Sequence, residues 1–191
     1  MISYLVHTHM EVIAMGYVHE VIRTMDTELN RIFTCLETLS EDQVWYRFKP
    51  TMNSIGNLCL HLVGNEYQHF VSGIGGNPNI RKRSMEFKSD GIYSKHEIKE
   101  LLTKTRNESL SILQHITETD FDKPIRVNYT VDDWTSMQDR DQDTEAELGY
   151  TRDLQIILYQ VCEHYAYHTG QIVILTKLLV DSEHSISGYK H

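Results

Sequence analysis

Four stretches of the chain carry apolar residues at intervals of three and four, and this periodicity constrains the fold more than any other feature. The spacing follows the 3.6-residue turn of an α-helix and predicts helices with one apolar face each. The stretches run from Val18 to Leu39, from about Asn53 to Phe70, from Ser94 to Thr117 and from Leu154 to Leu179. Four amphipathic helices that bury their apolar faces together form a four-helix bundle, so the sequence predicts an all-α fold.

The connections between these helices differ in character. Polar sequence from Ser72 to Asp90 shows no usable periodicity and predicts a long crossover between the second and third helices. Before the fourth helix, apolar and polar residues alternate, which predicts a short β-ribbon. The alternating apolar positions are Ile125, Val127, Tyr129 and Val131.

Length and composition fit one globular domain. The 191 residues are 40% hydrophobic and 24% charged, which is ordinary for a globular protein. We expect a single domain over residues 1–191, with its core at 18–180 and with tails at 1–17 and 182–191. The 18 Lys and Arg residues against 27 Asp and Glu residues give a net charge of −9, which disfavours nucleic acid as a partner.

The same sequence features bear on location. No apolar run approaches the ~20 residues that a bilayer-spanning helix needs, so no membrane partner is expected. The N-terminus lacks a basic leader followed by a continuous apolar segment, and a cytoplasmic location is the expectation. Cys35, Cys59 and Cys162 each lie in an apolar helical stretch, and we expect them to be buried, reduced thiols.

Two histidines four residues apart, His164 and His168, lie on one face of the fourth predicted helix. They replace apolar residues on the stripe that is expected to be buried. Burying an imidazole without partners costs a few kcal/mol. A shared cation would stabilise both, since neutral imidazole is a good ligand for zinc or nickel. The alternative is that each histidine hydrogen-bonds across the core, and the pair alone does not decide between the two.

A third candidate ligand, His61, lies beside the apolar stripe of the second predicted helix and can face the fourth helix across the bundle. A lone histidine in this position is more often a core residue than a ligand. Asn65 lies one turn beyond His61, and Gln171 lies nearly one turn beyond His168, so both are candidates for contact with a substrate. Interhelical hydrogen bonding is the alternative for each, and no catalytic residue is assigned.

Residues 54–65, with Trp45 and Pro50 before them, and residues 164–173 resemble the DinB-like (YfiT-like) superfamily of metal-dependent proteins. The resemblance covers roughly residues 18–179. It implies an up-down-down-up four-helix bundle and, in many members, a homodimer. Characterised members include thiol-dependent S-transferases and a mycothiol-dependent maleylpyruvate isomerase.

The resemblance also implies a divalent metal ion, zinc or nickel, held by His61, His164 and His168. Three protein ligands leave one or two open positions, where a water or a thiol binds and loses its proton near neutral pH. The leading hypothesis is therefore a metal-dependent thiol S-transferase that acts on a small-molecule substrate. Its cofactor would be a low-molecular-weight thiol such as bacillithiol.

Two alternatives stay open. The first is a metal-dependent hydrolase that uses the metal-bound water, and the second is a non-catalytic protein that binds a metal or another ligand. A basic or polar pocket beside the ion would favour the transferase. A carboxylate within one water of the ion would favour the hydrolase.

Overall fold

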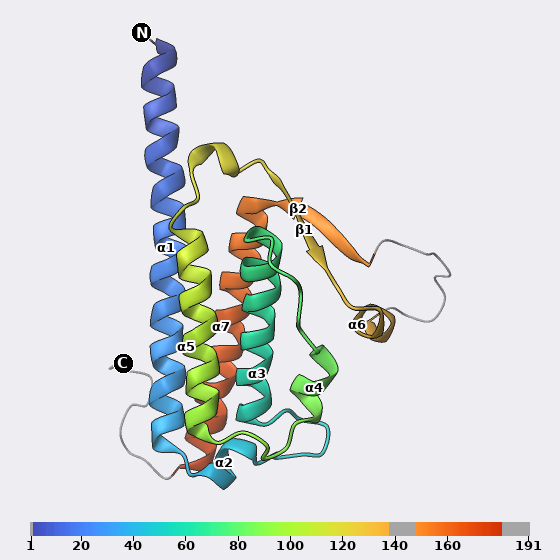
Figure 1. The fold of residues 1–191 in the computed structure, drawn as a ribbon. Coiled ribbons are helices and arrows are strands. Elements are labelled where there is room, and N and C mark those ends of the chain that lie inside the picture. The colour runs from blue at the N-terminus through green and yellow to red at the C-terminus, as the bar shows by residue number, and fades with distance from the viewer. Residues whose placement is uncertain (1, 138–147, 181–191) are drawn as a thin grey trace.

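The four apolar stretches form four long helices that pack side by side (Figure 1). In chain order these are α1 Ile2–Thr38, α3 Ile55–Glu66, α5 Lys95–Leu113 and α7 Leu154–Leu179. The structure is a computed structural model that describes the backbone of residues 2–137 and 148–180, and the side chains of residues 15–135 and 148–180. Residues 182–191, predicted as a tail, lie outside the described part.

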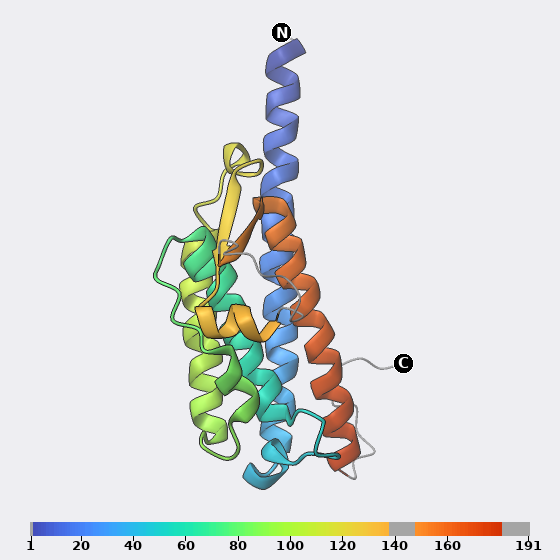
Figure 2. The ribbon, with the colours of Figure 1, turned by 90° about the vertical axis from the view of Figure 1, so that its right-hand side faces the viewer.

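The direction of the helices follows the order that the resemblance implies. α1 and α7 run in one direction, and α3 and α5 run in the other (Figure 1; Figure 2). α1 packs against α5 and α7, and α3 packs against the same two helices, so the four enclose one core. The predicted all-α bundle with an up-down-down-up order is confirmed.

The first helix begins earlier than predicted. Residues 2–17, expected to be a tail, continue α1 as helix, and this part extends beyond the end of the bundle (Figure 1). No proline or glycine occurs between residues 2 and 15, so the local sequence contains no residue that would stop a helix there. The periodic stripe identified the part of α1 that packs on the core, and not the whole helix.

Serine caps set the starts of three helices. Ser40, Ser54 and Ser94 each accept a hydrogen bond from the backbone N–H three residues on, in capping boxes that open α2 (Glu41–Trp45), α3 and α5. Ser54 pairs with Asn57, a buried residue whose amide also donates to the carbonyls of Glu86 and Ser89 at 2.9 and 2.8 Å. The start of α3 therefore also fastens the crossover.

The crossover is more ordered than the sequence suggested. α3 continues as a π-helix, η1 (Tyr67–Ile74), and a short helix, α4 (Arg83–Lys88), follows before α5. α4 packs on α3, which places the crossover against the outer side of that helix.

The predicted ribbon before the last helix is confirmed. β1 (Pro124–Asn128) pairs antiparallel with β2 (Gly149–Asp153), and Val127 lies opposite Tyr150. Val131 was expected to continue the strand, but it begins a short helix, α6 (Val131–Met137). A 3₁₀ turn, η2 (Glu118–Asp120), precedes β1.

The core of the bundle is largely apolar, and a buried ion pair, Arg106 with Glu66, lies within it. Arg106 of α5 donates to Glu66 of α3 at 3.2 Å and to Asp26 of α1 at 2.7 Å, so it links three helices. All three cysteines are free; Cys35 and Cys59 are buried, and Cys162 is half-buried. Among the described helices, none has the length and apolar character to cross a membrane.

Candidate metal centre

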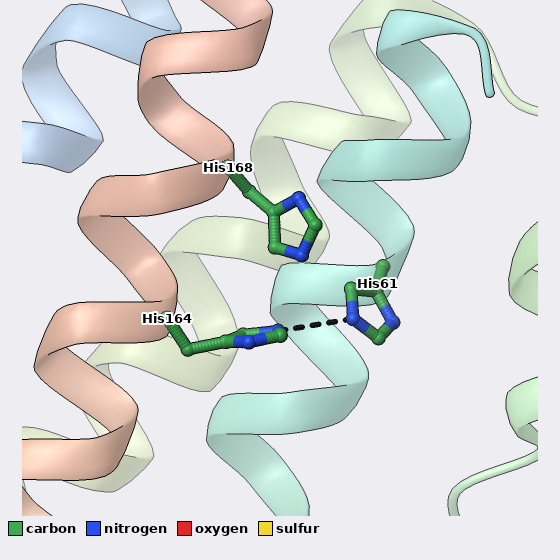
Figure 3. A group of neighbouring side chains, drawn as sticks. All are labelled: His61, His164 and His168. Carbon is green, nitrogen blue, oxygen red and sulfur yellow. Dashed lines mark hydrogen bonds between the residues drawn. The ribbon is translucent and has the colours of Figure 1, made fainter. Parts of the chain in front are cut away.

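Three imidazole rings converge in the space between α3 and α7 (Figure 3). Nε2 of His61 lies 3.0 Å from Nε2 of His164, and the ring of His168 lies 5.0 Å from that of His61 and 4.5 Å from that of His164, between centroids. One ring nitrogen from each histidine lies within 4.8 Å of the others. Two ligands of a tetrahedral zinc lie about 3.3 Å apart, so small ring rotations bring all three nitrogens onto one ion.

Two of the three rings have their proton placed by a neighbouring acceptor. Nδ1 of His61 lies 2.8 Å from Oε2 of Glu86, and Nδ1 of His168 lies 2.7 Å from Oε1 of Gln171. A terminal nitrogen of Arg81 also lies 3.1 Å from Nδ1 of His61, but the carboxylate of Glu86 is closer and can only accept. Nδ1 therefore carries the proton in both rings, and Nε2 carries the lone pair. The lone pair of His61 faces His164, which is the arrangement that a shared ion needs.

Glu86 belongs to a buried ion pair that lies behind His61. Arg81 donates from Nε to Oε1 of Glu86 at 2.7 Å and from a terminal nitrogen to Oε2 at 2.8 Å, and it also donates to Gln68 at 2.7 Å. Burial tends to raise the pKa of Glu86, but hydrogen bonds from Arg81 and His61 outweigh it and hold that pKa below its ordinary value. A carboxylate on the far nitrogen of a histidine is the usual support of a metal ligand.

α3 makes room for this pair at one position. A Cβ atom at Gly64 would overlap Oε1 of Glu86 and would lie 2.8 Å from Nε of Arg81. Only glycine lets the Arg81–Glu86 pair lie flat against α3, one turn from His61.

The burial of the three histidines differs from the prediction. His164 and His168 were placed on the buried stripe of the last helix, but both are half-buried; the stripe passes one residue further on, through Tyr165 and Thr169. His61, expected to flank its stripe, is only 5% exposed. The three histidines, His61, His164 and His168 (the trio), therefore comprise one buried ring and two rings at the edge of the core, which leaves a side for access.

The half-buried histidines are neutral at neutral pH. Burial, with the neighbouring His61 and His168, lowers the pKa of His164 to about 3. Burial also lowers the pKa of His168, although its hydrogen bond to Gln171 opposes the shift. Neutral rings keep the lone pairs that a metal requires.

A second polar cluster lies further along the same two helices. His69 is 2% exposed; its Nδ1 donates to the carbonyl of Asn65 at 2.7 Å, and its Nε2 accepts from the hydroxyl of Tyr150 at 2.8 Å. The Tyr150 oxygen in turn accepts from Gln160 at 3.3 Å. This cluster attaches β2 to the bundle above the trio.

The other predicted site residues lie near the trio. Gln171 contacts His168 directly, and Asn65 contributes its carbonyl to His69. Contact of either side chain with a substrate stays a prediction.

Sequence reasoning missed Glu86, Arg81 and His69. The first two lie in the crossover, where no periodicity indicates which residues turn inward. The one signal was that Glu86 is the only acidic residue in the basic run of residues 81–88.

A groove of about 490 Å³ lies between α3 and α5, on the other side of the buried pair. Gly64, Arg81 and Glu86 line it together with Lys82 and Lys104. None of the three histidines lines it, so this groove is separate from the access side of the trio.

Comparison with known proteins bears on both the fold and the family. Residues 20–179 match the family model described as mycothiol-S-transferase. A solved DinB-like protein from Bacillus cereus ATCC 10987 is similar in fold, with a TM-score of 0.59 and 16% identity over 83% of this chain and 90% of that chain. A DinB-like protein from Bacillus subtilis, YjoA, gives a TM-score of 0.57 and 15% identity over 86% of this chain and 94% of that chain. A search among curated proteins found no match.

The buried pair predicts an unequal response to one substitution. Glu86→Gln leaves the charge of Arg81 buried without its counter-ion, so the free energy of unfolding should fall by about 3 kcal/mol at pH 7. Glu20→Gln removes the carboxylate of an exposed pair with Arg23 and should change it little, because water screens that pair. Urea unfolding of both variants checks this, and equal losses would show that the Arg81–Glu86 pair is not held away from water.

The buried His69 predicts a pH dependence of stability. Burial lowers the pKa of His69 to about 4 in the folded chain, from 6.5 in the unfolded chain. Between these values the unfolded chain binds more protons, so from pH 7 to pH 5 the free energy of unfolding should fall by about 2 kcal/mol for this group. His69→Gln should flatten that part of the profile in urea titrations with a chelator present. Parallel profiles for the two proteins would contradict the assignment.

Proposed function

We propose, because the chain belongs to the mycothiol-S-transferase family and to the DinB-like superfamily, that it is a metal-dependent transferase of a small molecule. Its cofactor would be a low-molecular-weight thiol, mycothiol or bacillithiol. The observation that carries the proposal is the convergence of three imidazole nitrogens, two of them with their protons held on the opposite nitrogen.

His61, His164 and His168 would hold a divalent ion, zinc or nickel, through Nε2 of each ring. Three neutral nitrogen ligands are the donor set of catalytic zinc sites, which keep an open position. When bound, the ion supplies the Lewis acidity that stabilises a thiolate at neutral pH.

The residues around the trio have separate tasks in this proposal. Glu86 keeps the proton of His61 on Nδ1, and Arg81 balances the charge of Glu86. Gln171 keeps the proton of His168 on Nδ1, as Glu86 does for His61. Asn65 and Gln171 remain our candidates for contact with thiol or substrate. Holding both reactants in one orientation supplies much of the rate enhancement in such transfers.

The position of Glu86 favours a transferase over a hydrolase. A hydrolase needs a carboxylate that can take a proton from a water on the open side of the ion. Glu86 contacts Nδ1 of His61, on the side of the ring that faces away from the shared space, and Arg81 occupies both of its oxygens. It is therefore placed to orient a ligand and not to activate a water.

Two further properties belong to the proposal. Three free cysteines and a thiol cofactor suit a reducing compartment, so we propose a cytoplasmic location. We also propose a homodimer, as the resemblance implies.

Metal content tests the trio directly. Protein purified without added metal should contain about one zinc or nickel ion per chain, and His164→Ala should bind it more than about 100-fold more weakly, because loss of a ligand exceeds the effect of losing a ligand's support. His115→Ala, at an exposed histidine, is the control and should retain the metal. Equal metal content in wild type and His164→Ala, by elemental analysis, would remove α7 from the site.

Thiol consumption tests the reaction. With mycothiol or bacillithiol and an aromatic chloride, the sulfur–carbon bond forms, the carbon–chlorine bond breaks, and chloride and a proton are released. The metal-loaded protein should consume thiol at least about 10-fold faster than the chelated protein. Identical rates would argue for a non-catalytic binding protein, and metal-dependent ester cleavage without thiol would argue for the hydrolase.

A further inference from the structure

The outer face of α7 is apolar, opposite to the face that packs on the core. Its exposed large apolar residues recur at near multiples of a helical turn, so they form one stripe along the helix. They are Ile156, Tyr159, Tyr167, Ile174 and Leu178, which are 41%, 64%, 59%, 61% and 64% exposed. A helix that is apolar on opposite faces is normally buried on both.

The neighbouring helix shows what an exposed face looks like in this protein. The outward residues of α1 are polar or charged: Glu20, Arg23, Thr27, Asn30 and Thr34. α7 lies at the edge of the bundle beside α1 (Figure 2). The apolar stripe is therefore a property of α7 and not of the outer surface in general.

The size of the stripe is close to what a dimer needs. With a full area of roughly 175 Å² for each of these five residues, their exposed fractions leave about 500 Å² of largely apolar surface. That is near the upper end of the largest patch on an ordinary monomer, which is roughly 300–600 Å². Two copies would bury about 1,000 Å² from these side chains alone, and flanking residues would bring the total into the range of specific interfaces.

The centre of the stripe is complementary to itself. Gly170 lies in the middle of α7, where a Cβ would meet nothing within 4 Å, although glycine in a helix costs about 1 kcal/mol relative to alanine. Tyr167 lies three residues before it on the same outer face and is 59% exposed. When two such helices pack antiparallel, the Tyr167 ring of each can lie over the Gly170 of the other.

The charges on this face favour the same orientation. Glu163 and Lys177 lie on the outer face on opposite sides of this centre, and both are exposed. Antiparallel packing brings Glu163 close to Lys177 of the partner subunit. Parallel packing would instead place like charges together, which is unfavourable.

We propose that two copies of this chain pack their α7 helices antiparallel, about a twofold axis between Tyr167 and Gly170. The proposal names the surface of the homodimer proposed above, and it does not depend on the metal. The interface would be continuous with the candidate metal centre, because the ring of Tyr167 packs edge-on against that of His168 at 5.0 Å between centroids. Each protomer would thereby place Tyr167, the aromatic neighbour of His168, against α7 of the other protomer.

Two matched isoleucines test the surface. Ile174 is 61% exposed on the stripe, and Ile92 is 59% exposed in the crossover. Light scattering after gel filtration should give twice 22.3 kDa for the wild type and for Ile92→Glu, and 22.3 kDa for Ile174→Glu. A dimeric Ile174→Glu would overturn the proposal. A monomeric wild type would overturn it too, and would mean that the stripe binds a different partner.

Cross-linking gives a second, independent measurement. Gly170→Cys places a thiol near the proposed axis and should form a covalent dimer under mild oxidation, above the background of the wild type with its own cysteines. Ile92→Cys is the control and should not. Absence of cross-linking at Gly170→Cys in a dimeric protein would show that the dimer forms through a different surface. The metal content of Ile174→Glu should equal that of the wild type, so failure of the dimer proposal and failure of the metal proposal are distinguishable.

Discussion

The hydrogen bond between Glu86 and His61 is the contact on which the site depends. A buried carboxylate is costly unless a cation and donors compensate it, and here Arg81 provides the cation and His61 provides a donor. Because Glu86 and Arg81 lie in the crossover, the same contact fastens the crossover to α3. Gly64 permits the close approach, and Asn57 holds the neighbouring carbonyls of Glu86 and Ser89. One interaction therefore sets both the path of the chain and the direction in which the His61 lone pair points.

Much of the fold follows from local sequence, whereas the support of the site does not. Apolar periodicity is strong where a helix faces one core, so the bounds of α7 were predicted to the residue and the His164–His168 pair was recognised from its spacing. The contact of Glu86 with His61 joins positions in different elements, and no local pattern marks either Glu86 or Arg81. Periodicity also gave the wrong burial for His164 and His168, because residues at both the centre and the edge of a stripe recur at the same interval.

α7 combines three roles on one helix. Tyr165 and Thr169 pack into the core, His164 and His168 lie at its edge, and Tyr167 and Ile174 face outward. These faces are separated by about a quarter to half a turn, so substitutions only one or two residues apart should affect stability, metal binding or association separately. The exception is the contact of Tyr167 with His168, through which the outer face touches a candidate metal ligand.

The unequal burial of the three histidines gives the candidate site one open side. His61 is enclosed, and Glu86 behind it closes that side to solvent, whereas His164 and His168 are half-exposed along α7. In the proposed transferase, a thiol and its substrate would therefore approach from the α7 side, away from the Arg81–Glu86 pair. If the trio holds an ion, the buried ring of His61 with its fixed tautomer provides a rigid ligand, and the half-buried rings of His164 and His168 have room for the small rotations that a shared ion requires. That combination would suit a metal site that exchanges its fourth ligand, because the protein would hold one ligand firmly and leave the fourth coordination position accessible.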